Sequence, residues 1–139
     1  MSARSKARKQ SLDILYESDI RGTQPLDILN SRDAFEQGPD ARPIREYTRE
    51  LIAGVTLNRR KIDELISTYA QGWDMDRLPA VDRNIMRLAL FEMLWSGLDD
   101  AVAIDEALIL AKELSTDESA GYIHGVLGRI VSLKDNLAL

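Results

Sequence analysis

Four basic side chains gather in the first ten residues of the chain, MSARSKARKQ: Arg4, Lys6, Arg8 and Lys9. This stretch has none of the chain's 23 acidic residues, so it carries +4, while the rest of a chain of net charge −5 carries −9. Cationic side chains bind phosphate oxygens, and a basic end on an acidic body is typical of a segment that binds a polyanion. The alternative is a solvated terminus without a ligand.

Groups able to perform catalysis are scarce in the rest of the chain. His124 is the only histidine and there is no cysteine, which excludes a thiolate nucleophile and a histidine cluster for a metal. The acidic pairs 99–100, 105–106 and 117–118 are adjacent residues, whose side chains diverge by about 100° on a helix. No glycine-rich phosphate-binding motif is present. We therefore predict no catalytic residue, no metal site and no cofactor.

The elements that would position the basic residues are helices. Apolar residues recur at spacings of three and four throughout, and no run alternates as a strand would. We predict an all-α domain spanning residues 1–139, with 1–10 as a basic N-terminal arm. It contains about seven helices, over residues 12–20, 25–35, 44–55, 58–69, 79–95, 101–114 and 115–130. The segment after Ile85 is apolar on nearly every side, which predicts the central helix of the core.

Several residues mark the expected helix ends. Gly22 ends the first helix, Pro25 opens the second, and Asn58 caps the fourth. The motif STDE predicts a capping box with Ser115 as the cap and Glu118 reaching back to it. The stretch QGPDARP, residues 37–43, is the clearest loop, and Phe35 is expected to face inward just before it.

Three glycines in the last helix also require an explanation. Gly121, Gly125 and Gly128 lie four and three residues apart. Each glycine costs a helix about 1 kcal/mol relative to alanine. The spacing predicts a smooth strip against which another backbone packs closely.

Composition also bounds where the protein works. The acids in SLDILYESD interrupt any apolar stretch that could make the basic start a signal peptide. No apolar run approaches the ~20 residues that span a bilayer. Together with the absence of cysteine, this leads us to expect a soluble, cytoplasmic protein.

Five blocks of sequence, taken in order, resemble the NusB family of bacterial transcription antitermination factors. They are the basic start running into ARKQSLDILYE, then YTRELIAGVTLNRRKIDELI, RLPAVDRNIMRLALFEM, VAIDEALILAKEL and STDESAGYIHGVL. Each block alone is an ordinary helical segment, whereas five in this order and spacing are specific. One departure is His124, which stands where the family usually has an asparagine.

The resemblance implies a fold of two small helical bundles packed together. It also implies that the protein binds the boxA element of nascent RNA as a complex with NusE, a protein of the small ribosomal subunit. The pair acts in an antitermination complex that helps RNA polymerase read through terminators, notably in ribosomal RNA operons.

Site residues carried over from the resemblance fall near the start, in the middle and near the end of the chain. The family's basic start matches the four residues named first. The remaining residues expected to contact RNA are Tyr16, Tyr69, Glu118 and Tyr122, and those expected to contact NusE are Asp82 and Arg83. Tyr16 and Tyr69 lie at core spacing, so a packed ring is an equal alternative for each.

The sequence also leaves alternative functions to be considered. The chain could be a helical protein-interaction adaptor for which RNA is incidental; apolar docking would depend little on salt, whereas phosphate binding weakens steeply. A NusB-like module of an RNA cytosine methyltransferase is not expected, because no catalytic cysteine or cofactor-binding segment follows. The resemblance leaves a homodimer open.

Overall fold

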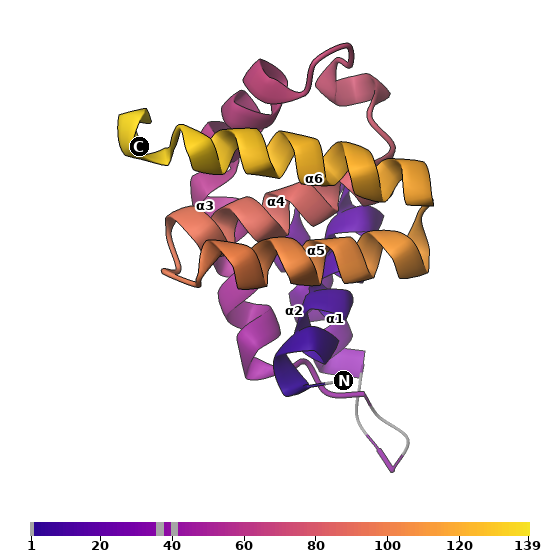
Figure 1. Ribbon diagram of the computed structural model, residues 1–139. Coiled ribbons are helices and arrows are strands. Elements are labelled where there is room, and N and C mark those ends of the chain that lie inside the picture. The colour runs from indigo at the N-terminus through magenta and orange to yellow at the C-terminus, as the bar shows by residue number, and fades with distance from the viewer. Residues whose placement is uncertain (1, 36–37, 40–41) are drawn as a thin grey trace.

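The computed structural model describes residues 2–35, 38–39 and 42–139 and shows only helices within them (Figure 1). There are six α-helices and two short 3-10 helices in this part of the chain, close to the seven helices predicted. Their bounds are α1 Ala3–Arg21, α2 Pro25–Phe35, α3 Glu46–Tyr69, η1 Met75–Arg77, α4 Ala80–Leu94, α5 Asp100–Leu114, α6 Asp117–Ser132 and η2 Lys134–Asn136.

Helix α4 lies at the centre of two packed bundles. Helices α1, α2 and α3 contact one another in the first bundle, α4, α5 and α6 do so in the second, and α4 also contacts α1 and α3. In Figure 1, α5 and α6 run side by side across one face. Every residue of α4 from Asn84 to Leu90 is buried, which confirms the predicted central helix. The core is therefore continuous through both bundles.

The predicted third and fourth helices are one helix, α3. Asn58 does not cap a helix there, because its side-chain amide donates to the carbonyl of Gly54 one turn earlier. Gly54 has a role that the sequence did not reveal. A Cβ built on it would lie 2.1 Å from the ring of Phe91, so α3 and α4 pack closely only because that position is glycine.

Two further helix ends, those at Gly22 and Pro25, agree with the sequence, whereas the start of α6 differs from it. Gly22 ends α1 in the left-handed conformation, with φ of +67°, and Pro25 is the first residue of α2. The predicted cap of the last helix is wrong, because Thr116 accepts from the backbone N–H of Ser119. The Ser115 hydroxyl instead donates to the buried carboxylate of Asp82, at 2.8 Å.

The glycines of α6 do not pack against another backbone within the described part of the chain. No heavy atom outside the local helix lies within 4 Å of a Cβ built on Gly121, Gly125 or Gly128. That prediction is wrong because these residues face outward, while Ile123 and Leu127 face the core.

The expectations for the loop 37–43 and for Phe35 fall wholly or partly outside the described residues. The predicted loop 37–43 includes residues 37, 40 and 41, which lie outside the described residues, as does the side chain of Phe35. Within the described residues, no helix has the length and apolar character needed to cross a membrane.

Candidate nucleic-acid interface

The basic start of the chain is the first part of α1 and does not stand apart from the body. Ser2 caps the helix by accepting from the backbone N–H of Ser5, at 3.0 Å. Ala7 and Arg8 are already buried. The expectation of an arm running past the body is therefore corrected: the helix is buried little more than one turn after its start, where Arg8 makes an ion pair with the body.

Arg8 forms a buried ion pair with Glu92 of α4. Its Nε and Nη2 donate to the two carboxylate oxygens, each at 2.9 Å, and the residues are only 4% and 1% exposed. Glu106 of α5 lies 3.5 Å from Arg8 Nη1. Burial alone would lower the pKa of Arg8, but its hydrogen bonds to Glu92 and the nearby acids raise it overall. Arg8 thus joins α1, α4 and α5.

Tyr47, near the start of α3, completes this group of residues. Its hydroxyl donates to Oε2 of Glu92, and burial followed by this hydrogen bond raises the pKa of Tyr47 to about 12. The guanidinium carbon of Arg4 lies over the tyrosine ring, 4.5 Å from its centroid, and that of Arg8 lies 5.7 Å away. We call Arg8, Tyr47, Glu92 and Glu106 the Arg8 network.

The other three basic residues of the segment reach solvent. Arg4 and Lys6 are exposed. Lys9 pairs with Glu113 of α5 at 2.6 Å, yet its side chain is 41% exposed. Tyr16, at 42% exposure, lies seven residues after Lys9 and so on the same face of α1. The structure therefore separates one inward arginine from a solvent-facing group of Arg4, Lys6, Lys9 and Tyr16.

A second candidate surface is a cleft between the residues that flank η1, the start of α4 and the start of α6. We call it the aromatic cleft; its volume is about 290 Å³ and its lining includes Trp73, Pro79, Glu118 and Tyr122. Burial raises the pKa of Tyr122, whose hydroxyl donates to the Gln71 carbonyl at 3.4 Å. The structure thus brings the expected Glu118 and Tyr122 together.

Trp73 is the residue of this cleft that the sequence analysis missed. It is 48% exposed, although tryptophan is among the residues that gain most from burial. Its position in the turn GWDMD, outside any helical stripe, was the available signal. The cleft therefore brings two aromatic rings together with two carboxylates, those of Asp82 and Glu118.

The remaining expected residues are engaged within the fold. Tyr69 is the last residue of α3 and is half-buried against the core. Asp82 is buried and accepts from Ser115. Arg83 donates to Asp19 and to the carbonyls of Met75 and Leu78. The last two side chains thus fix the corner that leads into α4.

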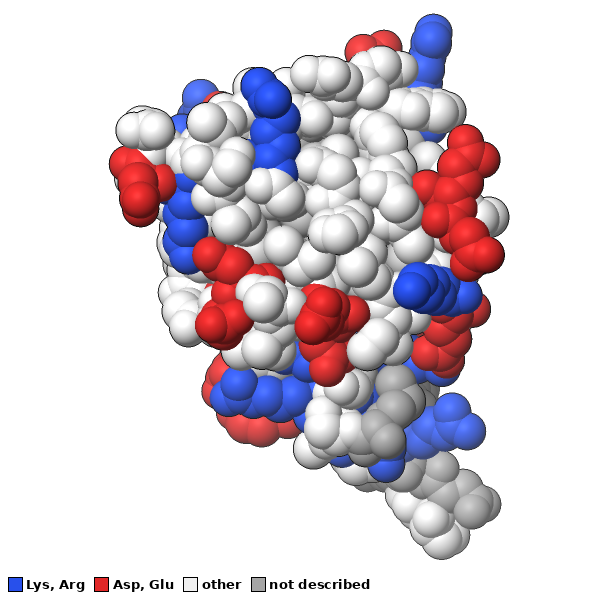
Figure 2. Space-filling model, in the orientation of Figure 1, with Lys and Arg blue, Asp and Glu red and all other residues white. Residues whose placement is uncertain are grey.

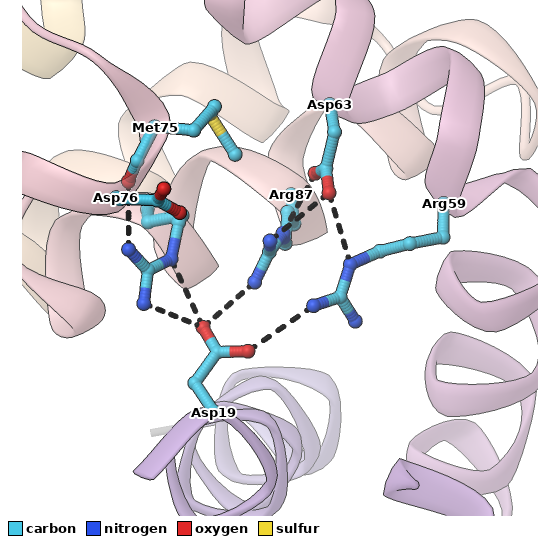
Figure 3. A pocket seen from close by; sticks show the side chains of 7 residues that line it. Asp19, Arg59, Asp63, Met75, Asp76 and Arg87 are labelled. Atoms are coloured by element: carbon cyan, nitrogen blue, oxygen red, sulfur yellow. Dashed lines mark hydrogen bonds and ion pairs between the residues drawn. The ribbon is translucent and has the colours of Figure 1, made fainter. Parts of the chain in front are cut away.

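A second charged group, which the sequence did not predict, surrounds Asp19 (Figure 3). The Asp19 carboxylate pairs with Arg87 at 2.8 Å, Arg83 at 3.0 Å and Arg59 at 3.1 Å. Asp63 pairs in turn with Arg87 and Arg59. Burial alone would raise the pKa of Asp19, but the arginines, Arg87 foremost, lower it overall. We call these five residues the Asp19 network.

The Asp19 network borders a cavity of about 350 Å³. The acids and bases of the Asp19 network pair with one another, and they come from α1, α3 and α4. The Asp19 network therefore holds these three helices together, and we call such a group of ion pairs a lock. Among the residues that the structure describes, no group of three or more histidine or acidic side chains could hold a metal ion.

Charge is unevenly distributed on the surface. The face over α5 and α6 is largely uncharged, with acids and bases around its margin (Figure 2). Ile109 of α5 is 51% exposed, and Val102 is also exposed. This face offers apolar contact, whereas the start of α1 offers cations.

Comparisons with known proteins agree on one family. The NusB family model matches residues 5–132. The chain is 50% identical to the transcription antitermination protein NusB of Saccharopolyspora erythraea, covering 99% of this chain and 92% of that protein. It is 48% identical to the protein of the same name from a Nocardioides species, covering 99% and 100%.

Solved structures agree on the fold. T. maritima NusB superposes with a TM-score of 0.80 at 32% identity, covering 94% of this chain and 92% of that one. The antitermination factors NusB and NusE in complex with double-stranded RNA superpose with a TM-score of 0.78 over 93% and 96% of the chains. At 23% identity, this second match shows the fold alone.

Proposed function

The chain belongs to the NusB family, and from that premise we propose that it is a transcription antitermination factor that binds boxA RNA together with NusE. The pair would help RNA polymerase read through terminators, notably in ribosomal RNA operons, in the cytoplasm. The observation that carries the proposal is the solvent-facing group of Arg4, Lys6, Lys9 and Tyr16 on α1. No catalytic step is part of this function.

The chemistry of this group suits single-stranded RNA. Phosphates attract the three exposed cations, and unstacked bases stack on exposed rings, each stack contributing about 1–3 kcal/mol by substitution. Lys9 would exchange the Glu113 carboxylate for a phosphate; because that pair is exposed, the exchange sacrifices less than about 1 kcal/mol. Arg4 and Tyr16 lie about 18 Å apart along α1, so the bound strand spans several nucleotides.

The four expected RNA contacts beyond the basic segment remain part of the proposal. Tyr16 extends the group on α1, and Tyr69 lies at the end of α3. Glu118 and Tyr122 line the aromatic cleft, where Trp73 supplies a second ring. A base in this cleft could stack on a ring while its amino group donates to the Glu118 carboxylate.

Arg8 supports the same function from inside the fold. Its guanidinium donates to both oxygens of Glu92, so it positions α1 and leaves phosphate contact to its neighbours. Asp82 and Arg83 likewise act from inside the fold, by positioning the surface that would contact NusE. Their contacts with Ser115 and Asp19 fix the corner at Leu78–Arg83, on which we propose that NusE docks.

The test is a titration of boxA-like RNA and of a scrambled RNA, with and without NusE. The wild type is compared with the triple variant Arg4→Ala, Lys6→Ala, Lys9→Ala, which leaves Arg8 in place. A matched control, Arg60→Ala, Lys112→Ala, Arg129→Ala, removes the same charge from exposed positions elsewhere. We expect at least a tenfold loss of boxA affinity in the first variant and a small change in the control. Equal affinities of wild type and triple variant would contradict the proposal.

The second candidate, a protein-interaction adaptor, is favoured by two exposed apolar side chains of α5, Ile109 and Val102. It predicts a partner whose affinity changes little with salt and falls on Ile109→Glu. Binding of boxA RNA that is insensitive to Ile109→Glu and steeply salt-dependent distinguishes the first function from this one.

A further inference from the structure

Arg4 is held differently from the other exposed cations of the basic segment. Its guanidinium carbon lies 4.5 Å from the centroid of the Tyr47 ring, within the ~6 Å range of a cation–π contact. Lys6 and Lys9 make no such ring contact among those that the structure describes. Arg4 as a whole is nevertheless exposed, so the side of the guanidinium away from the ring is open to solvent.

The ring beneath Arg4 is fixed by buried groups. The Tyr47 hydroxyl donates to Glu92, which is 1% exposed and is itself held by two hydrogen bonds from Arg8. The ring also packs against the hydrophobic core. Rotating Tyr47 away would leave a buried carboxylate with fewer donors, which is unfavourable. The Tyr47 ring, and the Arg4 guanidinium that lies over it, therefore have a defined position before RNA binds.

A flat cation with one covered side and one open side is suited to a nucleobase. Unpaired bases in RNA stack on arginine planes as they do on aromatic rings, whereas a lysine ammonium is a point charge without a plane. Placement in advance reduces the entropy lost when the base binds.

We propose that Arg4, positioned by Tyr47, is a stacking platform for one unpaired base of the bound RNA. Lys6 and Lys9 then bind phosphates, so the basic segment contains two kinds of contact. Tyr47 is a positioning residue in this account, acting through Arg4. The inference rests on the proposed RNA binding and adds to it which chemical part of the nucleotide Arg4 contacts.

The substitution Arg4→Lys separates stacking from charge. We expect it to weaken binding of boxA-like RNA about 5-fold or more, because losing one base stack costs at least about 1 kcal/mol. The slope of log affinity against log salt should stay unchanged, because the charge is kept. Arg4→Ala should weaken binding at least as much and leave that slope nearly unchanged, because Arg4 contacts a base and not a phosphate. Lys6→Ala is the matched control, which removes a phosphate contact and should make the slope shallower by about 0.7.

Fluorescence supplies a readout that a purely structural role would not change. A 2-aminopurine placed in turn at each position of the RNA should be quenched at one position by the wild type and by Lys6→Ala, and not by Arg4→Lys. Tyr47→Phe keeps the ring and its core packing but loses the hydrogen bond to Glu92, so its quenching should lie between those of wild type and Tyr47→Leu, and Tyr47→Leu should behave as Arg4→Lys. If Tyr47→Leu fails to fold, Arg4→Lys and Tyr47→Phe still decide the matter.

The outcomes separate the two proposals. If the wild type binds boxA-like RNA and Arg4→Lys matches it in affinity and quenching, the platform is refuted and the proposed function stands. If the wild type does not distinguish boxA-like from scrambled RNA, with or without NusE, the proposed function itself fails, and the platform fails with it.

Discussion

Helix α1 is locked to α4 at both of its ends, and the two locks have opposite polarity. At its start, Arg8 of α1 pairs with the acid Glu92 of α4. At its end, Asp19 of α1 pairs with the bases Arg83 and Arg87 of α4. The Arg8–Glu92 pair of the Arg8 network is buried from solvent. The Asp19 network instead borders a cavity and includes Arg59, whose side chain is partly exposed.

The difference shows that the surroundings of a charge, more than its type, decide what it can bind. Arg8 and Lys9 are neighbours in one basic run, yet Arg8 is buried against Glu92 and Lys9 lies at the surface beside Glu113. Only the second kind of pair exchanges readily for a phosphate, because a surface ion pair is weak while breaking a buried one leaves an uncompensated charge.

The largest effect should come from breaking the buried lock. Arg8→Met leaves Glu92 buried without its principal partner, and we expect a loss of about 3–5 kcal/mol in the free energy of unfolding, measured by denaturant titration. The double variant Arg8→Met, Glu92→Leu should recover much of that loss, because no charge is then left unpaired. A single variant within 1 kcal/mol of wild type would show that the lock is not structural.

The lock at the other end should be weaker. Asp19→Asn removes the acid that three arginines share, and we expect a loss of about 1.5–3 kcal/mol, since these hydrogen bonds are charged but lie beside a cavity. Asp13→Asn, an exposed acid on the same helix, is the control and should be neutral. If Asp19→Asn destabilises more than Arg8→Met, the ranking of the two locks is reversed.

The two locks should also fail at opposite ends of the pH scale. The folded pKa of Asp19 lies below its ordinary value of 3.8, so its contribution is present above pH 3.8 and is lost as pH falls through the folded pKa. The pKa of Tyr47 is raised from 10.0 to about 12, so its contribution is present below pH 10 and is lost as pH rises through 12.

Stability measured against pH checks this directly. Asp19→Asn should flatten the acid side of the profile and leave the alkaline side unchanged, while Tyr47→Phe should do the reverse. Either variant altering the opposite side would contradict the assignment of each lock to its end of the scale.

The smallest effect is expected at the surface pair next to the buried one. Lys9→Ala and Glu113→Ala should each change the free energy of unfolding by less than about 1 kcal/mol, because both side chains are well exposed. Glu113→Ala should nevertheless strengthen RNA binding, since it removes the carboxylate that competes with phosphate for Lys9. Unchanged RNA affinity in Glu113→Ala would show that Lys9 does not contact phosphate.

The sequence predicted features that depend on local pattern. Helical periodicity identified the fold class and the buried α4, and the conformational preferences of Gly22 and Pro25 marked two helix ends. The cap of α6 was misplaced because the Ser115 hydroxyl is used by Asp82, 33 positions away in the chain. The predicted break at Asn58 does not occur, because an amide can bond to its own helix.

The candidate site could be assembled from the sequence only in part, for the same reason. The resemblance supplied Glu118 and Tyr122, and charge supplied the basic segment. The partner of Arg8 lies 84 positions away and the ring beneath Arg4 lies on another helix, so neither the buried pair nor the role of Tyr47 could be inferred from spacing. Trp73 was missed because it lies in a turn, where periodicity carries no information.

The central claim is that the exposed cations of α1 bind RNA, Lys6 and Lys9 at its phosphates, while Arg8 holds the helix in place. Its most direct test is the slope of log affinity against log salt for a boxA-like RNA. The triple variant Arg4→Ala, Lys6→Ala, Lys9→Ala, folded as stably as wild type, should have a slope shallower by about 1.4, from about 0.7 for each of the two phosphate-binding lysines. A slope equal to that of wild type would contradict the account.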